Sequence, residues 1–599
     1  MSVTENDQTL PTWDLSPIFS GIDSRDFEDE FSALRDEIDV LVVLFDKHLV
    51  GVTDADLPSG STFDEILTGI SGLSDRIEVV YAFIYGLVST DARDAKAQAK
   101  LSELQEYLVE LSKLSTRLTA WLGSFDPDRI LEASVEARAS EFFVRRAGFE
   151  ARHQMSLQEE DLAASLSPTG ASAWSKLHTN VTSTLMVDVE SDEGVEHLPM
   201  SAVRALAYDP DERKRETAYR AELKSWETVE VPLAAALNSV KGTGNVLNSR
   251  RRWDSSVDAS LFLNNVDAAT LEAMQQAVVE SFPDFRRYLK AKARKLGKRS
   301  LPWWDLMAPL GSHGEGWTYA RAKEYILDSF STFSPRLSGL AKTHFDSDWV
   351  DVGPRDGKRD GAFCMHVGKG ESRVMMNFEP SFNSVQTLAH ELGHSYHNLN
   401  LVSRSYIQRE TPMALAETAS TFCQAVVFSA ALADATGEQK LALLEDSLQD
   451  ASQIVVDIHS RFLFEKAVFE SRQKREQSAQ ELNEIMLWAQ DETYGDALQA
   501  DARHPYMWAV KGHYYIPGLS YYNWPYTFGM LFAFGLYARF TQDRDGFPAV
   551  YDELLSSTGL GDAAELTSRF GIDIHSVEFW RTSLDMSRSQ IEEFEKLIP

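Results

Sequence analysis

Hydrophobic residues recur every three or four positions along most of the chain, which is the period of amphipathic helices. The pattern is clearest between about residues 26 and 160, for example at Leu101, Leu104, Leu108 and Leu111. Few glycines or prolines interrupt this region, so the sequence predicts a long run of helices there.

Two short segments have the character of strands instead. Thr184–Val189 is rich in apolar and β-branched residues, and an acidic, glycine-containing turn at 191–196 follows it. This pattern predicts a short hairpin, in which we interpret His197 as a turn residue. A second strand is expected at Arg373–Phe378, after the glycine-rich polar stretch 353–370.

Helical patterning dominates the remainder. A helix is expected over Asp209–Trp226, and another over Phe382–Leu399 directly after the second strand. Apart from a loop near 504–525, the chain then looks helical to its end. We therefore predict a mainly α fold with a small β-sheet beside the 382–399 helix, divided into an N-terminal helical lobe (1–198) that ends in the hairpin and a second domain (199–599).

Composition excludes several classes of protein. The chain has 599 residues, of which 43% are hydrophobic and 25% are charged, as in ordinary globular proteins. Its net charge of −33 argues against nucleic acid as the main partner, because binding phosphates requires clustered Lys and Arg. Two cysteines, Cys364 and Cys423, are too few for a disulfide framework and fit a reducing compartment.

Targeting signals are not visible in the sequence. The first residues lack a basic region followed by an apolar one, so we expect no signal peptide. Apolar runs such as Val79–Val88 look too short to span a bilayer, so no membrane partner is expected. We therefore expect a cytoplasmic protein.

The segment His390-Glu391-Leu392-Gly393-His394 carries the clearest chemistry. Two histidines four residues apart lie on one face of a helix, where their imidazoles can converge on one ion. The glutamate between them can then reach a water on that ion and take its proton. Apolar neighbours suggest that this helix is buried, where the polar groups need a compensating partner. We predict one zinc ion per chain, with Glu391 as the general base.

A catalytic zinc needs a third protein ligand and an open position. The metzincin extension is excluded, because it requires glycine at 397 and histidine at 400, where this chain has His397 and Asn400. Glu410 and Glu417 are the remaining candidates. Glu417 lies in the apolar, small-residue segment Met413–Thr421, where a lone carboxylate needs a partner, and this favours Glu417 over Glu410. His397 points to a neighbouring face, so we expect it to support the site or to face solvent, and not to bind the metal.

An unusual aromatic segment, His513–Tyr526, contains five tyrosines and one histidine in a loop with Gly and Pro. Any single tyrosine is more often a packing residue. A peptidase that uses zinc also needs a hydrogen-bond donor for the oxyanion of its tetrahedral intermediate, and this segment is the best supplier in the chain.

Taken together, these motifs resemble those of a known family. The chain is similar, over most of its length, to the oligoendopeptidase F branch of the thimet oligopeptidase family of zinc metallopeptidases. The resemblance rests on Trp13-Asp14-Leu15, Gly361–Cys364, Leu388–His394, Ala416–Ser420 and the tyrosine-rich loop. The first and last of these are loose matches, whereas the middle three are specific in their order and spacing.

The resemblance implies a mostly helical, two-lobed metallopeptidase with a deep central channel that admits short peptides and excludes folded proteins. The second domain, 199–599, would be its catalytic domain. By the family's motif the zinc ligands would be His390, His394 and Glu417, and Glu391 would be the general base.

The resemblance also assigns roles outside the metal centre. His513 corresponds to the family's transition-state histidine, with Tyr522 as the first choice and Tyr526 as the second choice for a hydroxyl donor. The segment around Gly368 and Gly370 and the strand after it would line the channel, and an extended peptide could pair with that strand.

One departure from the family concerns position 424. Many members carry a second glutamate seven residues after the ligand glutamate, where it supports a zinc histidine; this chain has Gln424. An amide oxygen still accepts a hydrogen bond from an imidazole but carries no charge, so weaker support of the histidine is expected.

The sequence therefore predicts a zinc-dependent endopeptidase that hydrolyses short, unfolded oligopeptides. One alternative is a metallocarboxypeptidase of similar helical architecture, although its relatives usually follow the ligand glutamate with a Ser-Gln-Ser type of sequence and this chain has Thr418-Ala419-Ser420. The other alternative is a peptide-binding protein with a vestigial site.

Overall fold

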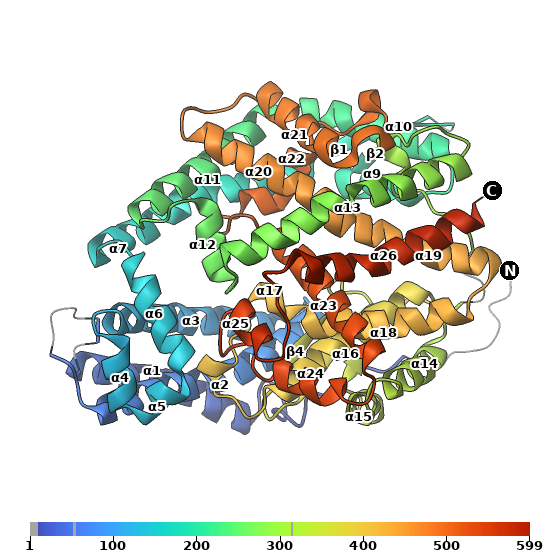
Figure 1. Cartoon of the computed structure of the whole chain (residues 1–599). Helices are drawn as coiled ribbons and strands as arrows, with labels where there is room; N and C mark the ends of the chain where they lie inside the picture. Colours follow the sequence, from blue (N-terminus) through green and yellow to red (C-terminus); the bar gives the residue numbers. More distant parts are fainter. Residues whose placement is uncertain (1–9, 49, 52–55, 193, 313–315, 599) are drawn as a thin grey trace. The chain divides into compact units, whose positions relative to one another are not determined.

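A computed structural model describes residues 10–48, 50–51, 56–192, 194–312 and 316–598 (Figure 1). The fold is mainly α-helical with two small sheets, as predicted. The chain divides into two compact units, each assembled from three separate segments. Unit 1 consists of Met1–Gln154, Glu315–Ala431 and Arg539–Phe570, and unit 2 consists of Met155–Gly314, Leu432–Ala538 and Gly571–Pro599.

These units differ from the expected division at residue 198. Neither unit begins or ends there, and the hairpin expected at the end of the first lobe lies inside unit 2. Residues from the second half of the chain return to complete unit 1. The first residues, on which the expectation of no signal peptide was based, lie outside the described part of the chain.

Unit 1 begins with the predicted run of helices, whose apolar faces pack into a core that includes Phe27, Phe63 and Trp121. Its second segment adds three strands and the helix of the His-Glu motif, and its third segment adds two short helices. Its elements are α1 (Arg25–Lys47), α2 (Gly60–Thr90), α3 (Ala95–Leu122), α4 (Pro127–Ala133), α5 (Val135–Ala139), α6 (Glu141–Arg152), α14 (Tyr319–Ser331), α15 (Pro335–Asp346), β3 (Val350–Asp351), β4 (Phe363–His366), β5 (Ser372–Met375), α16 (Phe382–Asn400), α17 (Met413–Ala416), α18 (Thr418–Asp434), α24 (Phe547–Leu555) and α25 (Ala563–Ser568).

The sheet of unit 1 has the strand order β3-β5-β4 and packs against α16. The expected second strand is β5, which is shorter than predicted and ends at Met375. It is parallel to β3 and antiparallel to β4, with Cys364 opposite Val374. The sequence did not predict β4. Because β5 is paired on both sides, the expectation that a peptide could pair with it is wrong; the outer strand beside it is β4.

The turn between β4 and β5 explains its glycines. Gly368, Lys369 and Gly370 all have left-handed backbone conformations, with φ of 93°, 54° and 74°. Glycine adopts this conformation without steric cost, so two of the three positions suit their residue. The turn closes through hydrogen bonds between the backbones of residues 367–368 and 371.

Unit 2 has a separate core that includes Trp226, Phe464 and Trp508. Its elements are α7 (Leu157–Leu166), α8 (Ala171–Thr184), β1 (Met186–Ser191), β2 (Gly194–Pro199), α9 (Met200–Ala205), α10 (Glu212–Glu227), α11 (Glu230–Arg250), α12 (Ser256–Leu263), α13 (Ala268–Lys295), α19 (Gly437–Ser452), the π-helical segment Gln453–Asp457, α20 (Ile458–Arg472), α21 (Ala479–Tyr494), α22 (Met507–Val510), most of α23 (Trp524–Gln542) and α26 (Val577–Leu597).

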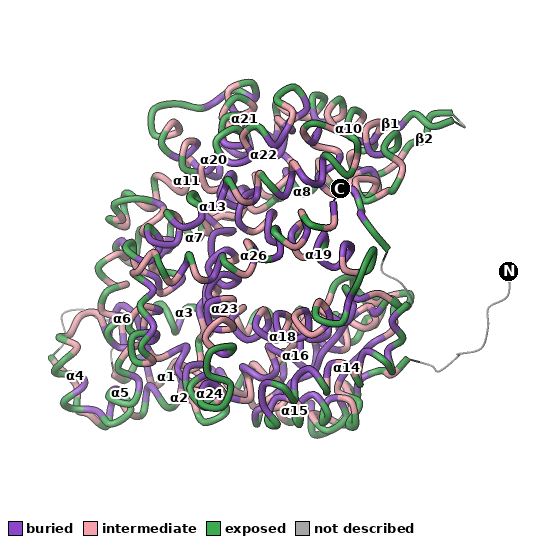
Figure 2. The backbone as a smooth tube through the Cα atoms, turned by 45° about the vertical axis from the view of Figure 1, so that its right-hand side comes forward, coloured by how far each residue is buried: buried purple, intermediate pink, exposed green. Residues whose placement is uncertain are grey.

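The predicted hairpin is present as β1 and β2, which pair antiparallel with Met186 opposite Pro199. Most of β2 is exposed, and Figure 2 shows the hairpin extending away from the helices around it. His197 lies within β2 and not in the turn, which corrects our interpretation of it. Its Nδ1 lies 2.7 Å from Oδ1 of Asp188 across the hairpin, so its role there is a local hydrogen bond.

One apolar segment is longer than we expected. Among the described residues, Met413–Asp434 is the one helical stretch with the length and composition to cross a membrane, so the expectation that all apolar runs are too short was wrong. However, 61% of its most apolar window is buried inside the fold, as in the core helix of a globular protein. The expected cytoplasmic location stays a prediction.

The backbones of α16 and α18 come into close contact at Gly393. A Cβ atom at this position would lie 2.5 Å from Cα of Ser420 and 2.6 Å from the carbonyl oxygen of Ala419. Both distances are far shorter than a van der Waals contact, and backbone atoms cannot rotate away as a side chain can. The glycine in the His-Glu motif is therefore what lets the two helices pack this closely.

We predict that Gly393→Ala lowers the free energy of unfolding by about 2 kcal/mol or more, because α16 and α18 must separate. Thermal or urea denaturation would measure the loss. The matched control is Gly339→Ala on α15, where an added Cβ meets no atom within 4 Å. That helical, exposed substitution should be neutral or stabilising by up to about 1 kcal/mol. Equal stability of both variants would contradict the packing argument.

Candidate metal centre

The helix α16 presents the two histidines of the motif side by side. It begins after Ser381, whose hydroxyl accepts a hydrogen bond from the backbone N–H of Ser384 and caps the helix. Its bounds, Phe382–Asn400, agree with the prediction to within one residue. His390 and His394 lie one helical turn apart, with their ring centroids 4.8 Å apart.

Glu417 occupies a break between two helices. The expected continuous helix through this segment is interrupted, because α17 ends at Ala416 and α18 begins at Thr418. The Glu417 backbone has φ −82° and ψ 1°, a turn conformation between the two. The hydroxyl of Ser420 donates a hydrogen bond to the Glu417 carboxylate at 2.9 Å. The break and this bond fix the direction of the carboxylate.

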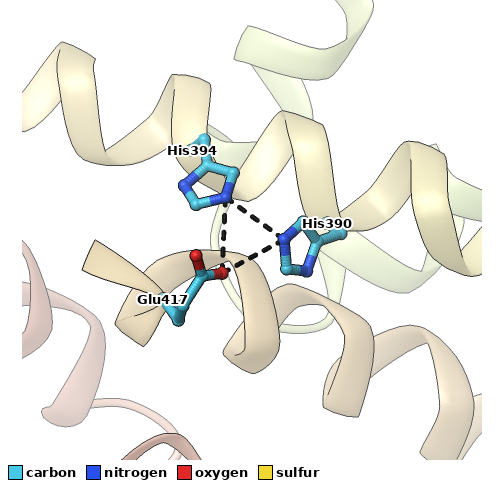
Figure 3. A group of neighbouring side chains, drawn as sticks. All are labelled: His390, His394 and Glu417. Carbon is cyan, nitrogen blue, oxygen red and sulfur yellow. Dashed lines mark hydrogen bonds and ion pairs between the residues drawn. The ribbon is translucent and has the colours of Figure 1, made fainter. Parts of the chain in front are cut away.

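Three donor atoms from these residues converge on one point (Figure 3). The Nε2 atoms of His390 and His394 are 3.1 Å apart, and they lie 3.2 and 3.5 Å, respectively, from one carboxylate oxygen of Glu417. Three ligands at about 2.05 Å from a tetrahedral zinc would be separated by about 3.3 Å. Two imidazoles and one carboxylate are also the donors that zinc prefers, so the residues fit this metal.

The charges of the group are mutually dependent. Burial acts to raise the pKa of Glu417, but hydrogen bonds to His390 and His394 outweigh it and hold that pKa well below its usual range. Burial likewise acts to lower the pKa of His390, but the Glu417 hydrogen bond and the nearby carboxylates outweigh it and raise that pKa. The site therefore holds an ionised carboxylate that favours protonated imidazoles beside it. A bound cation would stabilise the same carboxylate in their place.

Gln424 orients His390 from behind. The Oε1 atom of Gln424 lies 2.8 Å from Nδ1 of His390. An amide oxygen only accepts, so Nδ1 carries the hydrogen and Nε2 keeps its lone pair for a metal. This contact is the one that the sequence led us to expect at position 424.

Glu391 is buried beside the group, with an exposure of 6%. Burial raises its pKa, while the nearby imidazoles and a hydrogen bond from the backbone of Cys364 act to lower it. A carboxylate with a raised pKa is suited to accept a proton and release it again. The contact with Cys364 also places the strand β4 directly against this residue.

His397 and Glu410 lie outside the donor group. Burial lowers the pKa of His397 to about 4, and its Nε2 lies 2.9 Å from the hydroxyl of Thr558. Glu410 lies on an exposed loop. Together with His394, both residues line a cavity of about 280 Å³ within unit 1. Of the two candidate third ligands, Glu417 is the one whose oxygen meets the histidines.

The aromatic residues form a second cluster, which belongs to unit 2. The rings of His513 and Tyr522 are stacked with centroids 4.6 Å apart. The amide of Asn523 lies 2.9 Å from Nδ1 of His513, so Nδ1 accepts this N–H and the ring hydrogen is on Nε2. The hydroxyl of Tyr526 donates to that of Tyr522 at 3.1 Å.

Comparisons with known proteins identify the family. Residues 318–586 match the family described as Peptidase family M3, and residues 127–186 match the one described as Oligopeptidase F. Over residues 318–586 the chain is thus similar to peptidase family M3. It is 23% identical over 605 residues to an oligoendopeptidase F homolog of Lactococcus lactis, with 98% of this chain and 97% of that protein covered.

Solved structures share this fold. A crystal structure of oligoendopeptidase F from Enterococcus faecium matches with a TM-score of 0.69 and 18% identity over 96% of this chain and 99% of that one. A crystal structure from Chlamydophila abortus matches with a TM-score of 0.83 and 19% identity over 98% of both chains. The resemblance drawn from the motifs is thus confirmed, and the chain is a metalloendopeptidase, a hydrolase that acts on peptide bonds.

Sequence reasoning missed two contributors to the metal group and the aromatic cluster. One is β4, whose backbone contacts Glu391; the mostly apolar residues Phe363–Val367 after Gly361 are its one sequence signal, and that signal is weak. The other is Asn523, which sets the hydrogen of His513 and was hidden among aromatic neighbours. Neither residue type is diagnostic by itself, so only their contacts reveal them.

We predict that Gln424→Glu binds zinc several-fold more tightly than the natural protein, because a carboxylate attracts the His390 N–H more strongly and makes the ring a better ligand. Gln424→Ala should weaken binding by about tenfold or more. Competition with a chromophoric chelator measures both. Unchanged zinc affinity in the glutamate variant would show that this contact does not limit the site.

Proposed function

We propose that this metalloendopeptidase uses one zinc ion, held by His390, His394 and Glu417, to hydrolyse peptide bonds in short, unfolded oligopeptides. The observation that supports it most strongly is the convergence of three donor atoms, 3.1 to 3.5 Å apart, beside a buried carboxylate. This arrangement also disfavours a vestigial peptide-binding protein, because every ligand and the proposed base are in place.

The chain's own residues then perform the proton transfers. A zinc ion bound there would supply a Lewis acid that polarises the scissile carbonyl and acidifies water. Glu391 accepts the proton of the attacking water and delivers it to the leaving amine, a role that its raised pKa supports. Glu417 stays ionised as a ligand, and Gln424 holds His390 in the tautomer that leaves Nε2 available.

The strand β4 is suited to hold the substrate's backbone. It is the outer strand of its sheet, so one side of it has no strand partner within the described sheet. An extended peptide can add to such an edge through main-chain hydrogen bonds, whatever its side chains. Because the backbone of Cys364 contacts Glu391, a peptide paired with β4 lies beside the proposed base.

His513 and Tyr522 are the proposed donors to the oxyanion. Burial, together with the charge of Arg461, lowers the pKa of His513, so its imidazole donates from Nε2 while neutral. The Tyr522 hydroxyl accepts from Tyr526, which leaves its own O–H to be donated onward. The contact therefore favours Tyr522 as the donor and gives Tyr526 the role of positioning it.

We predict that Glu391→Gln keeps zinc but loses at least about a thousandfold in kcat, because the proton acceptor is removed. The substrate is a short peptide blocked at both termini, and its products are identified by mass spectrometry. Internal cleavage by the natural protein supports an endopeptidase, whereas no cleavage of the blocked peptide would favour the carboxypeptidase alternative. Glu410→Gln, which changes an exposed carboxylate outside the donor group, is the control and should retain activity. Unimpaired turnover by Glu391→Gln would refute the mechanism.

We also predict that Tyr522→Phe lowers kcat about a hundredfold with little change in KM, because a transition-state hydrogen bond is lost. Tyr526→Phe should reduce kcat by less, since it removes only a partner of the Tyr522 hydroxyl. Steady-state kinetics on the same peptide compares the two variants. The reverse order would assign the donor role to Tyr526.

A further inference from the structure

A large groove lies within unit 2, and its lining includes no metal ligand and neither of the stacked His513 and Tyr522 rings. Its volume is about 740 Å³, within the range of ligand sites, and α11, α12, α13 and α20 contribute its walls. Aromatic side chains line it, among them Trp253, Phe462, Phe469 and Tyr521. The proposed catalytic mechanism uses none of these residues.

The charged groups of the groove are strongly unequal in sign. Four carboxylates line it, from Asp254, Asp258, Glu272 and Glu470, against a single ammonium group from Lys466. Within the described part of the chain, none of these five side chains is in an ion pair. Their field is therefore not neutralised locally, and an aromatic lining with acidic groups favours a cationic, partly apolar ligand.

Tyr521 connects this groove to the aromatic cluster. Its backbone is left-handed, with φ of 55°, a conformation that residues other than glycine rarely adopt. Its ring packs against Phe462 and Phe469, with centroid distances of 5.1 and 5.7 Å. The next residue, Tyr522, is the proposed oxyanion donor.

A buried ion pair keeps Tyr521 in place. Its backbone N–H donates to Oε1 of Glu465 at 3.0 Å, and the same oxygen lies 2.5 Å from Nζ of Lys241. Both charged side chains are almost fully buried. The groove and the aromatic cluster thus share one turn of the chain, so a ligand in the groove contacts the residue that adjoins Tyr522.

We propose that this groove is a specificity subsite that binds basic residues of the peptide substrate, at positions away from the scissile bond. The occupant follows from the charge and the lining: Lys or Arg side chains pair with the carboxylates and lay their alkyl or guanidinium parts on the aromatic rings. The proposal rests on the proposed peptidase function, because a peptidase that uses Tyr522 as its oxyanion donor has a peptide substrate beside that residue.

Equilibrium binding tests the groove independently of cleavage. The full chain carrying Glu391→Gln is titrated into two fluorescently labelled peptides of equal length, one neutral and one with two lysines, and anisotropy gives both Kd values. We expect the basic peptide to bind at least about fivefold more tightly at low salt, with the preference shrinking as salt rises. The groove variant Glu272→Lys/Glu470→Lys should lose the preference.

The control variant Glu484→Lys/Asp501→Lys makes the same change in net charge at exposed positions outside the groove, and it should keep the preference. The proposal is overturned if the parent protein does not distinguish the peptides, if the groove variant still does, or if the control loses the preference equally. Cleavage of both peptides by the natural protein is measured in parallel. If the natural protein cleaves neither peptide, the proposed peptidase function is contradicted. The binding result then still decides whether the groove prefers basic peptides.

Discussion

The metal centre depends on the close contact between the backbones of α16 and α18 at Gly393. Both histidines lie on α16 and Glu417 lies in the break before α18, so the distance from the carboxylate to the imidazoles depends on how closely the two helices pack. Contacts to α24 hold both helices in this position. The hydroxyl of Tyr551 donates to the carbonyl of Thr418 at 3.2 Å, and Tyr396 on α16 is hydrogen-bonded to Asp552. A small change in helix packing would therefore act on all the ligands at once.

The parts of the fold that the sequence could predict were those determined by local periodicity. The i,i+4 histidines implied a helix with one polar face, and α16 agrees with that prediction almost to the residue. Glu417 was identified because an isolated carboxylate in an apolar segment needs a partner. The break at Glu417 was not predictable, since nothing in Ala416-Glu417-Thr418 disfavours a helix; packing against the histidines decides it.

Non-local features limited the sequence analysis in other places. The strand β4 is four residues long and follows a glycine-rich stretch, so its signal was too weak to separate it from a loop. His197 seemed to belong to a turn because the hairpin's register depends on a pairing that periodicity does not specify. The division into units could not be predicted from the sequence either, because it depends on which distant segments pack together.

The two units carry different parts of the chemistry. Unit 1 contains the metal ligands, the proposed base and the edge strand, whereas unit 2 contains the aromatic cluster and the acidic groove. Each set is held by interactions inside its own unit: helix packing in unit 1, and the Lys241–Glu465 ion pair and Asn523 in unit 2. Substitutions in the groove can therefore alter selectivity while the metal ligands keep their geometry.

The alternation of segments between the units has a consequence for biosynthesis. The ribosome delivers the metal-binding helices by residue 434, but α24, which packs on α16, follows only at Phe547–Leu555. Unit 2 is complete only with α26, at the end of the chain. The helical core of unit 1 comes, apart from Met375, from residues 13–147 and can close early. The paired histidines, however, emerge well before α24, which packs on their helix. The metal centre is thus completed late in synthesis, beside a helical core whose residues were all but one delivered much earlier.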